Sequence, residues 1–222
     1  MNIYRNINMI TCGMFNCYIL RCIGGEVLID TGTPEFRDEI ETWLLNYNVR
    51  LIVLTSGYND CIGNAAYFSE LYNAPIAMSG FDLPLINDNC CRNYYMTNPH
   101  EWNYRGKMKK IMKMRAEKFK PDHLLSDGDR LCDLMADGVY MTSEIVELDG
   151  HTRGTIGILD GNDLYCGNSA SGITSFNWPL TCESPLAAKR SLNKIKRISP
   201  DRLFFGHGKP MFSAERSLSL KF

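Results

Sequence analysis

Short apolar runs alternate with amphipathic stretches along most of this chain of 222 residues. Residues 17–22 and 25–30 are short apolar segments separated by a glycine turn, a pattern that predicts a hairpin. Residues 34–48 place bulky apolar side chains at helical spacing, with a proline near the start of the stretch. Residues 50–56 form a continuous apolar run, which is typical of a strand covered on both faces. The first quarter of the chain therefore predicts strands followed by a helix and a buried strand.

The remaining pattern continues the alternation of strands and helices. A helix is expected around residues 62–72, followed by a strand at 74–79. Residues 80–124 are the least regular part and include a basic segment, 105–120, that predicts a further helix. Later strands are expected at 138–149, 155–160, 163–167 and 201–206, with a last helix at 185–199. Local strand pairing followed by alternation favours a layered α/β fold. We expect one domain over residues 1–222, with an insertion or lid at about 80–124.

Composition narrows the class of protein. Hydrophobic residues make up 45% and charged residues 22% of the chain, and the formal net charge is -1. This balance gives no general attraction to nucleic acid or to acidic membranes, and neither partner is expected. No apolar run reaches the roughly 18 residues of a membrane span, and the first residues lack the pattern of a signal peptide. The nine cysteines form no C-x-x-C pair, so reduced thiols and a cytoplasmic location are expected.

Polar motifs follow several of the predicted strands in a fixed order. They are Asp30-Thr31-Gly32, the segment TSGYNDCIG at 55–63, LSDGD at 125–129, GHTRGT at 150–155, Gly167-Asn168 and Gly206-His207-Gly208. In this order they resemble the D-T-G, T-H-x-H-x-D-H-x-G, L-x-D-G-D, G-H-T-x-G-S/T, G-D and G-H-G motifs of the metallo-β-lactamase superfamily. The resemblance runs from about residue 16 to 210. It implies a four-layer αββα sandwich with the site at one rim of the two sheets.

The resemblance also implies which residues stand at the two metal positions of the family. Two histidines of the HxHxDH loop and the histidine of G-H-T hold the first metal, and the corresponding residues here are Ser56, Tyr58 and His151. Serine and neutral tyrosine are poor zinc ligands. We therefore expect the first metal site to be lost.

The second metal position keeps a competent set of ligands. The family's Asp, His and closing His correspond to Asp60, Cys61 and His207, all of which can bind zinc. The bridging carboxylate is replaced by Asn168, which carries no negative charge. These residues predict at most one metal, zinc or alternatively iron, which would activate a bound water for hydrolysis of a small molecule.

Four residues are the expected catalytic groups of such a hydrolase: Asp60, Tyr58, His151 and Asn168. Ser56, Tyr58, His151 and Asn168 are also expected to contact the substrate. Tyr58 would donate a hydrogen bond to a developing oxyanion. The basic segment 105–120 is compatible with a lid that attracts an anionic substrate, or with a solvated helix that packs through its methionines.

Other interpretations of the same residues stay open. The site can be free of metal, with Cys61 as a core thiol and Asp60 as a helix N-cap. In a further alternative, a nearby histidine activates the Cys61 thiol without any metal. The rival function is that of a catalytically inactive member that binds a ligand or a protein partner. The oligomeric state and the substrate are not determined by the sequence.

Overall fold

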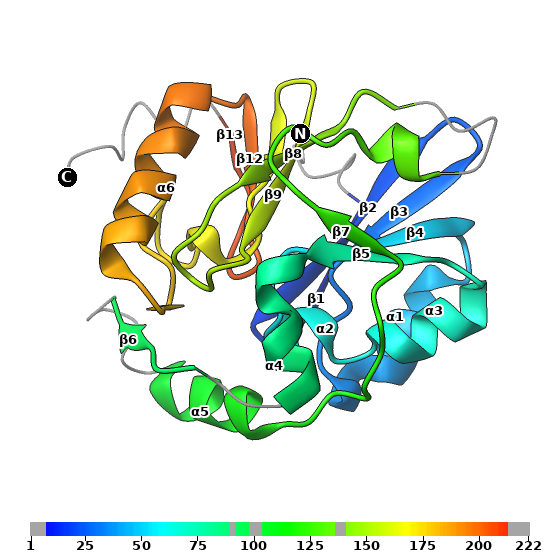
Figure 1. The fold of residues 1–222 in the computed structure, drawn as a ribbon, viewed down its shortest axis with the longest axis horizontal. Helices are drawn as coiled ribbons and strands as arrows, with labels where there is room; N and C mark the ends of the chain where they lie inside the picture. The colour runs from blue at the N-terminus through cyan, green and yellow to red at the C-terminus, as the bar shows by residue number, and fades with distance from the viewer. Residues whose placement is uncertain (1–7, 89–91, 98–103, 136–140, 213–222) are drawn as a thin grey trace.

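The computed structural model describes residues 8–88, 92–97, 104–135 and 141–212. Two sheets pack face to face, and helices cover the outer face of each (Figure 1). The helices on one side are α1 (Arg37–Leu44) and α3 (Ala65–Tyr72), and the helix on the other side is α6 (Pro185–Ile198). The predicted four-layer αββα sandwich is confirmed.

The first sheet is built from the N-terminal half of the chain. In sheet order its strands are β1 (Met9–Cys12), β2 (Phe15–Cys22), β3 (Gly25–Ile29), β4 (Val49–Leu54), β5 (Ile76–Ser79) and β7 (His123–Leu125). The β1–β2–β3 part is antiparallel, whereas β3, β4, β5 and β7 run parallel. The carboxyl ends of the parallel strands therefore meet at one edge of the sheet.

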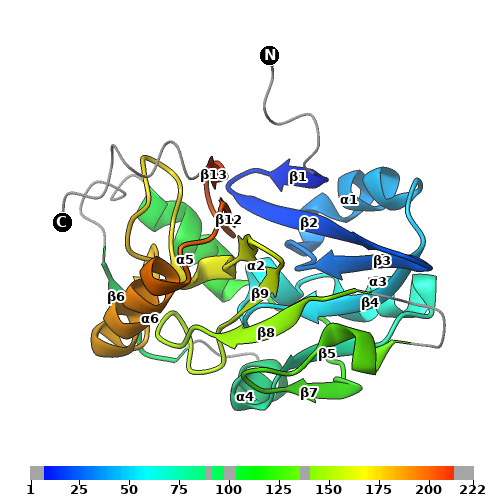
Figure 2. The ribbon, with the colours of Figure 1, turned by 90° about the horizontal axis from the view of Figure 1, so that it is seen from above.

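The second sheet comes from the C-terminal half and faces the first (Figure 2). In sheet order its strands are β13 (Met211–Phe212), β12 (Arg202–Phe204), β10 (Asp163–Tyr165), β9 (Ile156–Asp160) and β8 (Glu144–Glu147). Here β10 and β12 are parallel, so the loops that follow them leave from the same end.

Three apolar layers hold the four structural layers together, because neighbouring residues of a strand point to opposite faces. In β4, Leu51 and Val53 join the layer between the two sheets, whereas Ile52 and Leu54 pack towards α1 and α3. The third layer joins the second sheet to α6 through residues such as Leu192. This two-sided burial explains why β4 reads as a continuous apolar run.

Several element boundaries differ from the sequence expectations. The helix expected at 34–48 is a 3-10 turn (Pro34–Phe36) followed by α1, which ends at Leu44 in a turn closed by the Tyr47 N–H. The strand expected at 138–149 is confined to β8, and residues 136–140 lie outside the described part of the chain. Asparagines after Leu44 are weak helix formers, which agrees with the early end of α1.

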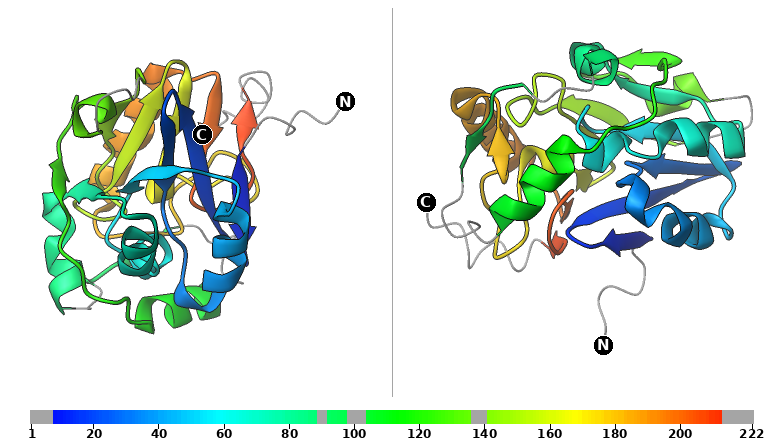
Figure 3. Two further views of the ribbon diagram at one scale, coloured as in Figure 1. Left: turned by 90° about the vertical axis from the view of Figure 1, so that its right-hand side faces the viewer. Right: turned by 90° about the horizontal axis from the view of Figure 1, so that it is seen from below.

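The segment at 80–124 contains a 3-10 turn (Gly80–Asp82), α4 (Leu83–Asp88), β6 (Tyr95–Met96) and α5 (Arg105–Lys113). Strand β6 pairs with β11 (Thr181–Cys182). Ile111 of α5 packs against Leu180 and Met14, so α5 lies across the edge shared by the two halves, as the view from below in Figure 3 shows. Among the described residues, none of the helices has the length and apolar character that crossing a bilayer requires.

Candidate functional site

The predicted site residues converge at one edge of the two sheets. They follow β4, β8, β10 and β12, whose loops meet above α5, and each is at most 4% exposed to solvent. A continuous chain of side-chain contacts joins all seven positions: Ser56, Tyr58, Asp60, Cys61, His151, Asn168 and His207. The sequence motifs therefore do mark one buried polar cluster.

The D-T-G turn fixes where the loop after β4 begins. Asp30 adopts a left-handed backbone conformation, with φ of 58°, and its carboxylate accepts hydrogen bonds from Thr55 N (2.8 Å) and Thr55 Oγ1 (2.7 Å). Burial raises the pKa of Asp30 to about 7. Thr31 holds the other end of the loop, since its N–H and its hydroxyl both donate to the Cys61 carbonyl oxygen.

The Asp60 carboxylate lies on the short helix α2 (Asn59–Ile62) and is shared between two N–H donors. Its Oδ2 atom is 3.0 Å from His207 Nε2 and 2.8 Å from Asn168 Nδ2. Burial by itself raises the pKa of Asp60, but the hydrogen bond and the positive charge of His207 outweigh it and bring the pKa below its usual value. Asp60 is therefore a buried carboxylate whose charge is balanced within the protein.

The two histidines are held in the same way through their Nδ1 atoms. His151 Nδ1 lies 2.8 Å from the Thr181 carbonyl oxygen, and His207 Nδ1 lies 2.7 Å from the Met14 carbonyl oxygen. A carbonyl only accepts, so each Nδ1 carries a proton. Burial lowers the pKa of His151, which leaves its Nε2 as an acceptor. His207 Nε2 faces the Asp60 carboxylate and is a donor there.

The Cys61 thiol is surrounded by hydroxyl and amide groups. Its Sγ atom is 3.2 Å from Ser56 Oγ, 3.7 Å from Thr55 Oγ1 and 3.7 Å from Asn168 Nδ2. Burial, followed by the negative charges of the two nearby aspartates, raises the pKa of Cys61 well above its usual value. The environment therefore favours the neutral thiol, while nucleophilic and metal-binding cysteines use the thiolate.

The Tyr58 side chain contacts Glu183 and His151. It donates to Glu183 Oε1 at 3.2 Å, and the Tyr58 ring packs edge-on against His151 with the ring centroids 5.1 Å apart. The oxyanion role of Tyr58 stays a prediction, as does the substrate contact of Ser56, whose hydroxyl donates to Cys61.

Comparisons with known proteins identify the fold. No protein-family model matches the chain, and no curated protein matches its sequence. Solved structures do match. TTHA1623 in a di-iron-bound form superposes with a TM-score of 0.68 at 19% identity, over 94% of this chain and 95% of that one. A metallo-β-lactamase superfamily protein from Sulfolobus tokodaii, ST1585, gives a TM-score of 0.67 at 18% identity, over 97% and 85% of the two chains.

A further match is a true lactamase by name. The subclass B3 metallo-β-lactamase BJP-1 of Bradyrhizobium japonicum superposes with a TM-score of 0.64 at 19% identity, over 91% of this chain and 75% of that one. The chain has the metallo-β-lactamase fold. At such low identity the comparison establishes the fold, and the chemistry of the site depends on the residues present in this chain.

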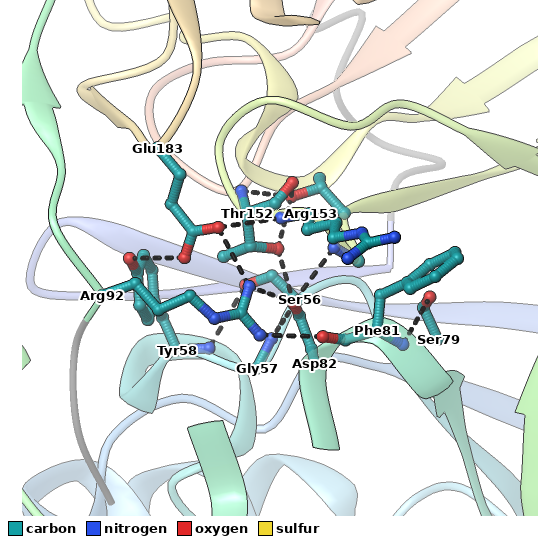
Figure 4. Close-up of polar contacts among 12 residues, drawn as sticks. Ser56, Gly57, Tyr58, Ser79, Phe81, Asp82, Arg92, Thr152, Arg153 and Glu183 are labelled. Atoms are coloured by element: carbon teal, nitrogen blue, oxygen red, sulfur yellow. Dashed lines mark hydrogen bonds and ion pairs between the residues drawn. The ribbon is translucent and has the colours of Figure 1, made fainter. Parts of the chain in front are cut away.

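A second polar cluster lies beside Ser56 and Tyr58, at the predicted first metal position (Figure 4). Its centre is the fully buried Asp82, which accepts hydrogen bonds from Gly57 N (2.8 Å), Thr152 Oγ1 (2.5 Å) and Gly154 N (3.0 Å). Arg92 approaches the same carboxylate at 3.5 Å. Asp82 thus ties the loop after β4 to the loop after β8.

Glu183 extends this cluster towards Tyr58. Arg92 Nη1 and the Arg153 N–H both lie 3.0 Å from Glu183 Oε2, and the second Arg92 nitrogen donates to the Phe81 carbonyl at 2.7 Å. Sequence reasoning missed Asp82, Arg92 and Glu183, because they belong to none of the motifs.

One signal for Asp82 was present in the sequence. A Cβ atom on Gly57 would lie 2.9 Å from the Asp82 side chain, and a Cβ atom on Gly154 would lie 2.6 Å from it. Glycines in two separate motifs indicate that another segment approaches both loops closely.

The residues at the second metal position do not suit a metal ion as they are arranged. Within the described ranges, no three His, Cys, Asp or Glu side chains converge on a point that could hold a metal. His207 Nε2 is engaged with the Asp60 carboxylate at 3.0 Å, so two of the three expected ligands contact each other, and burial raises the pKa of the Cys61 thiol. The predicted ligation by Asp60, Cys61 and His207 stays a prediction that this geometry does not favour.

Proposed function

We propose that this chain uses the metallo-β-lactamase fold to bind a ligand and does not hydrolyse substrates through two metals. The main observation behind the proposal is the replacement of two expected metal ligands at the first metal position. Ser56 and Tyr58 stand where the family has histidines, and their hydroxyl groups donate to Cys61 and Glu183 inside the protein. Serine and neutral tyrosine are poor replacements for imidazole as metal ligands, so a metal that would activate water lacks two of its usual ligands there.

The remaining groups are poorly placed to replace metal activation by acid–base catalysis. A general base needs an accessible lone pair within hydrogen-bond reach of the water. The Asp60 oxygen that faces the cluster already accepts from His207 and Asn168. His151 is 2% exposed, and its Nε2 atom faces the Asn168 amide at 3.4 Å. Ligand binding is therefore the activity that this site supports best.

A small cavity beside the cluster is the favoured place for a ligand. It has a volume of about 200 Å³ and is lined by Gly13, Met14, Phe15, Glu35, Phe36, Lys110 and Ile111. Met14 also supplies the carbonyl that contacts His207, so one residue links the cavity lining to the cluster. Pockets for drug-sized molecules are roughly 300–1,000 Å³, which indicates a smaller ligand.

The chemistry of the cavity indicates a ligand with an apolar body and one anionic group. Its walls are mainly apolar, and Lys110 is the one cation among the lining residues. Lys110 pairs with the exposed Glu35 at 2.9 Å, and a bound anion would compete for that ammonium group. A single cation at an apolar wall selects for short carboxylates or phosphate esters with a hydrocarbon chain.

Single-metal hydrolysis is the second candidate function. It is favoured by the orientation of the two histidines, because an Nδ1–H donated to a main-chain carbonyl is the arrangement found in metal-binding histidines. His151 and His207 both show it. The likeness of the fold to metallo-hydrolases agrees with this candidate at the level of the superfamily only.

The two candidates are separated by a binding and turnover experiment on the intact protein. Hexanoate and hexyl phosphate serve as binding probes in calorimetry, and nitrophenyl hexanoate serves as the hydrolysis probe. We expect saturable binding that is weakened about tenfold by Lys110→Ala, because one charge-assisted contact is lost. Lys113→Ala, on the same helix but outside the cavity lining, should leave the affinity unchanged.

Metal-dependent turnover of the ester would contradict the proposed function. Hydrolysis of the ester by the wild type that disappears with a chelator and returns with zinc would establish the second candidate. Absence of saturable binding for both probes would remove the cavity as the ligand site.

A further inference from the structure

Asn168 occupies the middle of the polar cluster, where the family resemblance places a bridging carboxylate. Its amide nitrogen lies 2.8 Å from Asp60 Oδ2, 3.4 Å from His151 Nε2 and 3.7 Å from Cys61 Sγ. All three neighbours are atoms with lone pairs, and all three are types that bind metals. The amide group thus presents N–H bonds to the atoms that would otherwise face a cation.

The orientation of the amide follows from its surroundings. If oxygen and nitrogen were exchanged, an amide oxygen would lie 2.8 Å from the Asp60 carboxylate, which is repulsive. On its other side, Asn168 Oδ1 has no hydrogen-bond partner among the described residues. A Cβ atom on Gly206 would lie 2.0 Å from that oxygen. The side chain is therefore packed against the Gly206 backbone in the orientation that directs its donors to the cluster.

The cluster joins parts of the chain that are far apart in sequence. Asn168 reaches Asp60 over 108 positions, and His207 reaches Asp60 over 147 positions. In a metallo-hydrolase, a metal ion makes such connections by coordination and supplies the positive charge that the carboxylate needs. Here the connections come from the side-chain nitrogen atoms of Asn168 and His207, which both meet Asp60 Oδ2.

We propose that the Asn168 amide takes the place of a metal ion in this fold, so that hydrogen bonds tie the site loops together and the native protein needs no metal. The inference deepens the proposed function, because both discard two-metal chemistry. It goes further in assigning to the cluster a structural role that is independent of any ligand.

The inference predicts a specific effect of the change Asn168→Asp. The variant replaces a donor by an acceptor and brings a second carboxylate to about 2.8 Å from Asp60, in a buried position. Two carboxylates at that distance require a proton or a cation between them. An exposed counterpart exists for comparison: Asn162 donates to Asp201 Oδ2 at 2.9 Å on the surface. Asn162→Asp is therefore a matched control for the change in charge.

The experiment measures metal content by mass spectrometry and the midpoint of thermal unfolding, in chelator and in added zinc. Wild type should contain far less than one metal per chain, and its midpoint should be the same in both conditions. Asn168→Asp should lower the midpoint in chelator by about 6–12 °C, as expected for a buried unpaired charge in a protein of this size. Asn162→Asp should change the midpoint by less than about 2 °C.

The wild-type measurements decide the matter even if Asn168→Asp does not fold. Stoichiometric metal in the wild type, or a midpoint that falls on chelation and recovers with zinc, overturns the inference. An Asn168→Asp midpoint in chelator equal to that of Asn162→Asp also overturns it. The proposed function is tested separately. Ester hydrolysis by metal-free protein would contradict the proposed function and leave this inference intact. Bound metal without hydrolysis would contradict this inference and leave the proposed function intact.

Discussion

Two buried carboxylates connect loops at the edge of this sandwich, and only one of them could be identified from a sequence motif. Asp60 stands in a recognisable motif and is 3% exposed, while Asp82 stands in no motif and is fully buried. Asp60 is balanced by His207 and Asn168. Asp82 is balanced by two backbone N–H groups, a threonine hydroxyl and the guanidinium of Arg92.

The two carboxylates have the same structural role. Each connects separate loops, and each is tolerated in the interior because protein donors replace its hydration. A motif that resembles a metal ligand therefore does not establish a metal, since a carboxylate with enough N–H and O–H partners is already satisfied. If protein donors alone satisfy Asp60 and Asp82, loss of either carboxylate should destabilise the fold without any dependence on metal.

Loss of the Asp82 carboxylate should have the largest effect. Asp82→Ala leaves the N–H groups of Gly57 and Gly154 and the Arg92 charge without their acceptor. We expect the free energy of unfolding to fall by about 3–5 kcal/mol, as for a broken buried ion pair. Urea denaturation measures it, with Asp201→Ala on the surface as the control. A loss under 1 kcal/mol, on the order of a surface change, would contradict a structural role for Asp82.

Removal of the Asp60 carboxylate should have a smaller effect, because fewer donors lose their acceptor. Asp60→Ala should cost about 2–3 kcal/mol, on the scale of unsatisfied buried donors. The loss should be identical in chelator and in zinc, since the stabilising contacts of Asp60 are with His207 and Asn168. A loss that appears only in zinc would show that Asp60 binds a metal and would break the equivalence with Asp82.

Loss of the hydrogen bond that joins the two clusters should reduce stability less than either change above. The Tyr58 hydroxyl donates to Glu183 at 3.2 Å, and Tyr58→Phe should cost about 0.5–1.5 kcal/mol, the net value of one hydrogen bond. In a double-mutant cycle with Glu183→Gln, the two losses should not add, because both changes affect the same contact. Strict additivity would mean that the two side chains stabilise the fold independently.

An exposed carboxylate with similar partners shows how much of the stability effect depends on burial. Asp127 accepts from Lys194 Nζ (2.8 Å) and from Glu147 N (2.6 Å), but its side chain is 54% exposed. Asp127→Asn should therefore cost only about 0.2–1 kcal/mol. A loss comparable to that of Asp82→Ala would mean that the number of partners, and not burial, decides the effect.

The pH dependence of this exposed pair has a defined sign. Partial burial is the largest influence and raises the pKa of Asp127, but the hydrogen bonds from Lys194 and the Glu147 N–H and the positive charge of Lys194 together outweigh it, and the pKa lies below the usual value. The folded protein thus holds this proton less tightly than the unfolded chain. The contribution of Asp127 is present above the unfolded pKa, near 4, and is lost as the pH falls through the lower folded pKa. The stability difference between wild type and Asp127→Asn should therefore shrink as the pH is lowered below about 4.

The apolar periodicity of the sequence was sufficient for a layered α/β fold, because it reflects which faces of strands and helices are buried, and the resemblance of the motifs added the four-layer sandwich. The two-sided burial of β4 and the amphipathic pattern of α6 are local properties of the chain. The order of motifs also identified the seven side chains that meet in the buried polar cluster around Asn168. Element ends such as that of α1 were less accurate, since a single turn, closed here by the Tyr47 N–H, decides them.

The tertiary structure decided what the identified residues do. Whether Asp60 meets a metal or an amide depends on the position of Asn168, whose side chain packs against the backbone of Gly206 on another loop. Asp82, Arg92 and Glu183 gain their roles only from loops that meet in space. Composition and spacing determine which groups are available to the site. Donor and acceptor directions determine its chemistry, and they arise only when distant segments pack together.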